Sequence, residues 1–155
     1  MKQQLVFTDN TLLSDENDAF IMLAEDDVDD QDFFIETFCK QTSSIKICTV
    51  DNGYKLLEIL NNLPADKLPL LIILDYNLPQ AGGGLILQTL QGNTQLAKIP
   101  KIVWSTTSSE FFEKRCLSLG AKSYIKKPNH MHGFEEISRR LLELCDKQAN
   151  NRAAA

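Results

Sequence analysis

One pattern repeats along the chain: a short apolar segment is followed by a stretch with the periodicity of an amphipathic helix. The apolar segments occupy residues 20–24, 45–50, 70–74, 101–104 and 123–126. Short strands that alternate with helices of about ten residues indicate a parallel sheet covered by helices on both faces. The sequence therefore predicts an α/β fold, a doubly wound five-stranded parallel sheet built from five βα units.

Composition restricts the kind of protein further. The chain has 155 residues, of which 43% are hydrophobic and 24% charged, as in one soluble domain with its own core. A net charge of -5 without a basic run argues against nucleic-acid binding. No apolar segment reaches the roughly 18 residues that a membrane helix needs. The cysteines are far apart and form no CxxC pair, which is typical of reduced thiols, so we expect a cytoplasmic protein.

The pattern also suggests where the domain begins and ends. Residues 19–148 hold all the predicted elements and form the predicted domain. For the leader, residues 1–18, three alternatives stay open: disorder, an added edge strand, or a dimer arm. Residues 149–155 are expected to be a tail that is too short for a second domain.

Side chains of complementary chemistry follow four of the predicted strands. In chain order they are Glu25 with Asp26 and Asp27, then Asp75, then Ser105 with Thr106, and finally Lys127. Because the carboxyl ends of parallel strands meet at one edge of a sheet, we expect these groups to lie together. Each has a plainer explanation as a helix cap, a turn residue or a surface lysine. Their convergence on one edge favours a site.

These residue types suit phosphoryl transfer. Carboxylates in close contact do not all stay ionised without a cation, and Mg²⁺ binds one or two carboxylates together with phosphate oxygens. A lysine and a hydroxyl can stabilise the charge of a phosphoryl group. No His, Cys or Ser–His pair is placed to act as the nucleophile, so Asp75 is the candidate for an aspartyl-phosphate.

Four segments carry a resemblance to a known family: "LAEDD", "LIILDYNLPQAGG", "PKIVWSTT" and "GAKSYIKKP". In this order and spacing the chain resembles the receiver domain of two-component response regulators, the group of the chemotaxis regulator. The resemblance covers residues 20–147 and implies a flavodoxin-like sheet with strand order 2-1-3-4-5. The arrangement is also similar to the small stand-alone regulators that partner phytochrome-type kinases.

The resemblance implies roles for the acidic residues. Asp75 would accept a phosphoryl group from a phosphohistidine of a kinase. Asp26 would bind Mg²⁺ directly and Glu25 through water, while Asn77 would contribute its backbone carbonyl. Independently of the resemblance, Asp29, Asp30 and Asp32 lie near the start of the following predicted helix, where acidic residues suit the positive end of the helix dipole.

The resemblance also implies the switch residues. Lys127 would pair with Asp75 or with its phosphoryl oxygens, and the Lys127–Pro128 bond would be cis. Ser105 would move toward the phosphoryl group, and Tyr124 would turn from solvent into the vacated space. Thr106 stands where the family usually has Ala or Gly, so we expect it to hinder attack by water and by bulky donors.

The leading hypothesis is a single-domain response regulator. Its expected partners are a sensor histidine kinase or phosphotransfer protein and a downstream target protein, and a homodimer is possible. The first rival is a Mg²⁺-dependent aspartyl-phosphate phosphatase, although Asn77 lacks the second acid that such enzymes place two residues after the nucleophile. The second rival is a pseudo-receiver that works without phosphorylation, against which the intact set of acids, serine and lysine speaks.

Overall fold

A computed structural model describes residues 4–5 and 19–155. Its elements in chain order are β1 (Gln4–Leu5), β2 (Ala19–Ala24), α1 (Val28–Gln41), β3 (Ile45–Val50), α2 (Gly53–Asn62), β4 (Ile72–Asp75), α3 (Gly83–Gln91), the 3-10 helix η1 (Leu96–Lys98), β5 (Lys101–Ser105), α4 (Glu110–Ser118), β6 (Ser123–Lys126) and α5 (Met131–Ala153). Each predicted strand and helix is present at its expected place.

The described strands form one parallel sheet in the order β1-β3-β2-β4-β5-β6. Without β1, this is the predicted order 2-1-3-4-5, which is confirmed. The sixth strand is the short β1, whose Gln4 and Leu5 pair with Ile47 and Cys48 of β3. Of the alternatives for the leader, these two residues take the edge strand; the rest of the leader lies outside the described residues.

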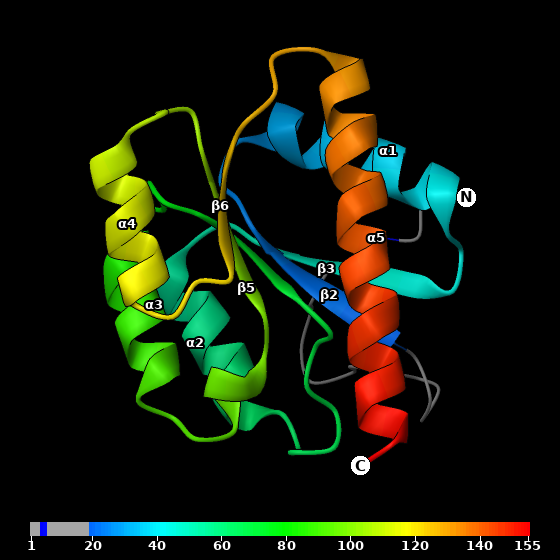
Figure 1. Cartoon of the computed structure of the whole chain (residues 1–155), viewed down its shortest axis with the longest axis vertical. Helices are drawn as coiled ribbons and strands as arrows, with labels where there is room; N and C mark the ends of the chain where they lie inside the picture. The colour runs from blue at the N-terminus through cyan, green and yellow to red at the C-terminus, as the bar shows by residue number, and fades with distance from the viewer. Residues whose placement is uncertain (1–3, 6–18) are drawn as a thin grey trace.

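Two apolar cores lie on opposite faces of the sheet. Helices α1 and α5 cover one face, and α2, α3 and α4 cover the other (Figure 1). The central strand β4 supplies both cores, because Ile72 and Leu74 face α2 and α3 while Ile73 faces α1 and α5. A strand buried on both faces has to be apolar at successive positions, which explains the continuous run before Asp75.

Local capping and close packing set where several helices begin and end. The carboxylate of Asp27 accepts a hydrogen bond from the N–H of Asp30 at 3.0 Å and so caps α1. At the start of α2, a Cβ on Gly53 would lie 2.5 Å from the carbonyl oxygen of Ala81, so only glycine fits there. Gly120 has φ of +96° and terminates α4, as predicted.

The last helix is longer than the sequence predicts. α5 continues to Ala153, so most of the expected tail is helical. Arg152 holds this end in place by donating hydrogen bonds to the carbonyls of Leu68 and Pro69 at 2.7 and 2.6 Å. The division into leader, domain and tail stays a prediction. Within the described part of the chain, no helix is both long and apolar enough to cross a membrane.

Candidate functional site

Three carboxylates meet at the carboxyl edge of the sheet. Ala24 pairs with Leu74 across β2 and β4, so the residues that follow, Glu25 and Asp75, lie side by side. Glu25 is fully buried, Asp75 is 4% exposed and Asp26 is exposed. One oxygen from each of the three carboxylates lies within 4.8 Å of the others. The predicted convergence of Glu25, Asp26 and Asp75 is present.

Lys127 reaches into this carboxylate cluster from the end of β6. Its Nζ lies 2.7 Å from Oε2 of Glu25, 3.0 Å from Oδ2 of Asp75 and 3.1 Å from Oδ2 of Asp30. The side chain is only 7% exposed. The same Nζ lies 5.4 Å from the ring centroid of Trp104, in cation–π range. The ammonium is therefore surrounded by carboxylates and one aromatic face.

Sequence reasoning missed Asp30 as a site residue. Its place in the first turn of α1 has a sufficient explanation in the helix dipole. A second signal was available, because side chains of a helix lean toward its N-terminus and α1 begins at the site edge of the sheet. An acid in that turn can therefore point back at the strand ends, as Asp30 does toward Lys127.

The pKa values follow from burial and from the charges. Burial raises the pKa of Glu25 to about 7, although the Lys127 ammonium and the N–H of Asp27, which donates to Oε1 at 3.0 Å, both act to lower it. Burial acts to lower the pKa of Lys127, but the carboxylates of Glu25 and Asp75 outweigh it, and the pKa of Lys127 is raised. The ammonium is thus firmly protonated.

The donor set of the carboxylate cluster fits a hard divalent cation. Mg²⁺ binds one or two carboxylates together with water molecules, and carboxylate and carbonyl oxygens also suit Mn²⁺. Oε2 of Glu25 contacts Lys127 as an ion pair, but no described donor is aligned to hydrogen-bond it, so a lone pair is left for a cation. Asp75 accepts from the N–H of Asn77 at 2.9 Å through Oδ1, and the side chain of Asn77 is exposed.

Ser105 and Tyr124 both fasten the loop between β5 and α4. Ser105 is fully buried, and its Oγ accepts a hydrogen bond from the N–H of Thr107 at 3.1 Å. The hydroxyl of Tyr124 donates to the carbonyl of Thr107 at 2.7 Å. Tyr124 was expected to start in solvent, but here it is half-buried against the core under α2–α4. Thr106, between the two loop contacts, is exposed.

The cis bond expected between Lys127 and Pro128 is wrong for this structure. The described residues contain no cis peptide bond. The trans form is the lower in energy for any peptide bond, and with it the N–H of Lys127 still donates to the carbonyl of Ser105 at 2.7 Å.

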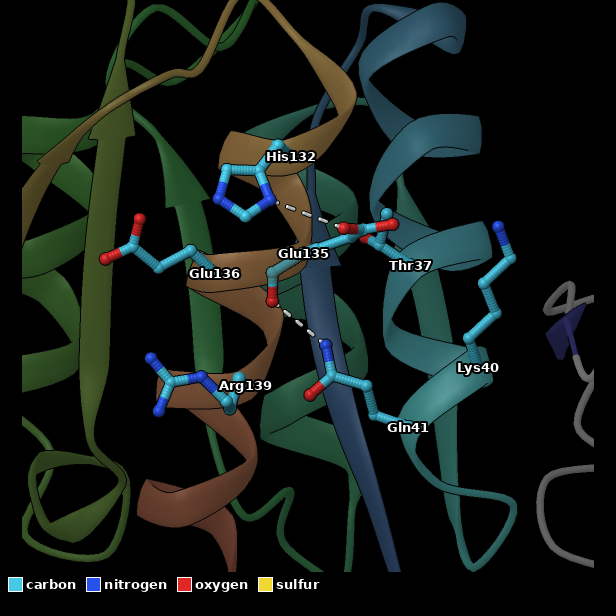
Figure 2. A pocket seen from close by; sticks show the side chains of 7 residues that line it. All are labelled: Thr37, Lys40, Gln41, His132, Glu135, Glu136 and Arg139. Atoms are coloured by element: carbon cyan, nitrogen blue, oxygen red, sulfur yellow. Dashed lines mark hydrogen bonds and ion pairs between the residues drawn. The ribbon is translucent and has the colours of Figure 1, made fainter.

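A hollow of about 400 Å³ lies on another part of the surface, between α1 and α5 (Figure 2). Its lining includes Lys40 and Gln41 from α1 and His132 and Glu135 from α5. Figure 2 shows Gln41 reaching across to the carbonyl of Glu135, a hydrogen bond of 2.9 Å. None of the predicted site residues lines this hollow, so it is separate from the carboxylate cluster.

Comparison with known proteins identifies the family. Residues 21–138 match the family model of the response regulator receiver domain. The chain belongs to this family. The predicted resemblance is confirmed, and the receiver is part of a signalling family.

Several relatives are plant proteins. The two-component response regulator ORR7 of Oryza sativa subsp. japonica is 28% identical over 124 residues, which cover 80% of this chain and 57% of that protein. ORR4 of subsp. indica is 30% identical over 145 residues, covering 83% of this chain and 62% of that protein. The chain therefore spans about three fifths of the length of these relatives.

Solved structures agree with the fold. The phosphorylated cyanobacterial phytochrome response regulator RcpA superposes with a TM-score of 0.74 at 27% identity, covering 82% of this chain and 93% of that one. The Mn(2+)-bound form of response regulator Rcp1 gives a TM-score of 0.71 at 24% identity, covering 79% and 91%. The flavodoxin-like receiver fold is thus confirmed.

Proposed function

We propose that this receiver takes a phosphoryl group from the phosphohistidine of a sensor histidine kinase or phosphotransfer protein onto Asp75. The observation that carries the proposal is the setting of the Asp75 carboxylate. One oxygen is held by the N–H of Asn77 and the other by Lys127, next to two further acids. In the reaction an Asp75 oxygen attacks phosphorus, the P–O bond forms, the P–N bond breaks and the histidine nitrogen keeps the electron pair.

Four residues are proposed to hold Mg²⁺: Glu25, Asp26 and Asp75 through carboxylates and Asn77 through its backbone carbonyl. When bound, the ion supplies positive charge to the phosphoryl oxygens. Lys127 stabilises the same developing negative charge with its ammonium group, which stays protonated. The neighbouring Mn(2+)-bound structure of Rcp1 supports a divalent ion in this family.

The output is proposed to be a change of protein contacts in the cytoplasm, by a receiver that acts as a single domain. Ser105 would leave Thr107 to bond a phosphoryl oxygen, and Tyr124 would follow the loop that Thr107 belongs to. The two hydrogen bonds of Thr107 to these residues support such a coupling, because both are made to the same residue of the loop between β5 and α4. Couplings of this kind are typically worth about 1–3 kcal/mol.

A labelling experiment tests the proposal. The protein is incubated with Mg²⁺ and acetyl phosphate, and a single base-labile phosphoryl adduct on Asp75 is expected. Asp75→Asn should abolish it. The matched control is Asp51→Asn, because Asp51 also follows a strand at this edge but pairs only with Lys55 and Asn52 among the described residues.

Two other outcomes would contradict the proposal. Sustained turnover of many phosphate monoesters would favour the phosphatase, although the exposed Asn77 offers no acid for the leaving group. The absence of any adduct, even with a histidine kinase supplied, would favour a pseudo-receiver.

A further inference from the structure

Lys127 has one carboxylate partner that does not belong to the carboxylate cluster. Asp30 lies on α1, and its Oδ2 is 3.1 Å from Nζ, nearly as close as the Glu25 and Asp75 oxygens. The Asp30 side chain is 25% exposed, so it closes the site from the solvent side while Glu25 and Asp75 form the buried side.

The three partners differ in what else they can do. Glu25 and Asp75 belong to the group of carboxylates that could share a cation, and Asp30 does not. An oxygen that binds a cation is a poorer acceptor for an ammonium, and the two positive charges repel each other. On phosphorylation the Asp75 carboxylate itself would lose its charge, and the negative charge would lie on the phosphoryl oxygens instead. Asp30 is therefore the partner whose contact with Lys127 does not compete with a bound cation.

The ring of Trp104 also contacts the Lys127 ammonium, which lies over its face. The Trp104 ring lies 5.4 Å from Nζ and is 1% exposed. Phe34 and Phe134 pack against it edge-on, with ring centroids 5.7 and 6.1 Å away, so the ring is fixed by the core. Asp30 from α1 and Trp104 from β5 thus form a support for Lys127 that is independent of the carboxylate cluster.

We propose that Asp30 is a positioning residue for phosphoryl transfer: it holds the Lys127 ammonium beside Asp75 when the carboxylate cluster binds a cation. The effect of Asp30 on phosphoryl transfer rests on the proposed function, but the position of the Lys127 ammonium can be measured without any phosphorylation. Asp30→Asn keeps the size of the side chain and removes its charge, so the ammonium loses the anionic partner that does not share a cation.

The first test follows the ammonium protons of Lys127 by ¹H–¹⁵N NMR at saturating Mg²⁺. In the unaltered protein they are expected to exchange slowly with water, and in Asp30→Asn roughly tenfold faster or more, because a loosely held ammonium is solvated. Asp29→Asn is the matched control: it removes the same charge from the same helical turn, and Asp29 is exposed and has no ion pair among the described residues. In Asp29→Asn the ammonium protons of Lys127 should exchange as slowly as in the unaltered protein.

A conservative variant separates positioning from a general effect on the helix. Asp30→Glu restores a carboxylate at the same place and should recover most of the protection of the Lys127 protons. If Asp30→Asn protects them as well as the unaltered protein does, or if Asp29→Asn loses protection equally, the inference is overturned. These outcomes do not depend on whether Asp75 is a phosphoacceptor.

The second test measures labelling by acetyl phosphate. At saturating Mg²⁺, Asp30→Asn should label Asp75 about tenfold more slowly, because misplacing a catalytic group by about 1 Å costs that much or more. The Mg²⁺ concentration for half-saturation, read from the emission of Trp104, should change by less than roughly threefold. Trp104 is the only tryptophan in the sequence.

The two proposals fail in different ways. Equal labelling rates in Asp30→Asn and the unaltered protein, or a change in Mg²⁺ affinity alone, would overturn the role of Asp30. If the unaltered protein takes no label on Asp75, the proposed function is wrong, and the exchange of the Lys127 protons still decides what Asp30 does.

Discussion

Glu25 and Lys127 form an ion pair of 2.7 Å, yet the pKa of each is raised. An isolated pair would lower the pKa of the acid. Here one ammonium contacts Glu25, Asp30 and Asp75, and Asp26 adds a further carboxylate to the cluster. The single positive charge of Lys127 is shared among these carboxylates. Burial, which disfavours the ionised form, is the largest influence on the pKa of Glu25. The negative charge of the carboxylates is therefore not fully balanced by Lys127, and a proton or a second cation would stabilise it. This imbalance is the physical basis for the binding of a divalent ion.

Thr106 offers a prediction about the lifetime of the phosphoryl group. It is exposed and directly follows the buried Ser105. A β-branched side chain there restricts the approach of water, so Thr106→Ala should speed dephosphorylation by about tenfold, a change of ~1.4 kcal/mol in the barrier. The measurement is the loss of label from Asp75 after acetyl phosphate is removed.

The neighbouring Thr107→Ala is the control for Thr106. The contacts of Thr107 with Ser105 and Tyr124 are made by its backbone and survive the substitution. A dephosphorylation rate of Thr106→Ala within twofold of the unaltered protein would mean that the Thr106 side chain does not restrict the approach of water.

Single residues differed in how well the sequence predicted them. Glu25, Asp26, Asp75 and Lys127 were predictable because each ends or follows a strand, and the strand ends of a parallel sheet share one edge. Asp30 was not, because it comes from a helix whose position relative to Lys127 depends on tertiary packing. The half-buried position of Tyr124, whose hydroxyl bonds the carbonyl of Thr107, likewise depends on the conformation of a loop, which periodicity does not encode.

Among elements, the strands and helices with long-range apolar patterning were predictable and the others were not. The central strand reads as a continuous apolar run because it is buried on both faces. The edge strand β1 has two residues, too few for any periodicity. The final turns of α5 lack an apolar stripe; Arg152, bound to a distant loop, holds them instead.

Strand β5 carries an unusual buried charge that gives an element-scale prediction. Lys101, its first residue, is 1% exposed, and its Nζ donates to the carbonyl of Ala97 at 2.9 Å. Burial lowers the pKa of Lys101. Methionine has a similar volume and no charge, so Lys101→Met should raise the free energy of unfolding at pH 7 by about 1 kcal/mol.

The effect of Lys101→Met should depend on pH. The pKa of Lys101 is lower in the folded protein than in the unfolded chain, so the unaltered protein gains stability as pH rises from the folded value toward 10.5. The advantage of the variant should therefore shrink between pH 7 and pH 10 in denaturant unfolding. Lys98→Met, at an exposed position of η1, is the control and should change little. A variant less stable than the unaltered protein at pH 7 would show that the Ala97 bond outweighs the burial of charge.

Across the whole molecule, α5 and the segment that contains β4 are tied together at both ends. At the site edge, Lys127, just before α5, binds Asp75 at the end of β4. At the opposite edge, Arg152 near the end of α5 binds the carbonyls of Leu68 and Pro69, just before β4. Figure 1 shows α5 running along the full height of the sheet. The segment that ends in Asp75, the proposed phosphoacceptor, is thus held at one end by Lys127, just before α5, and at the other by Arg152 of α5.

The contact of Arg152 with the carbonyls of Leu68 and Pro69, the lower tie in Figure 1, gives the prediction at this scale. Arg152→Ala removes two charge-assisted hydrogen bonds and leaves the carbonyls of Leu68 and Pro69 to water, so the free energy of unfolding should fall by about 1–2 kcal/mol. Amide hydrogen exchange should accelerate in the last turns of α5, which lack other anchors of this kind. Labelling of Asp75 should stay within roughly twofold, because the upper tie through Lys127 is intact.

The control is Arg140→Ala, which removes an exposed arginine of the same helix whose side chain makes no ion pair or hydrogen bond among the described residues. It should leave both stability and exchange nearly unchanged. If Arg152→Ala slowed labelling as strongly as it loosened the helix end, the two ties would be coupled through β4 and α5. The length of α5 would then belong to the mechanism as well as to the stability of the fold.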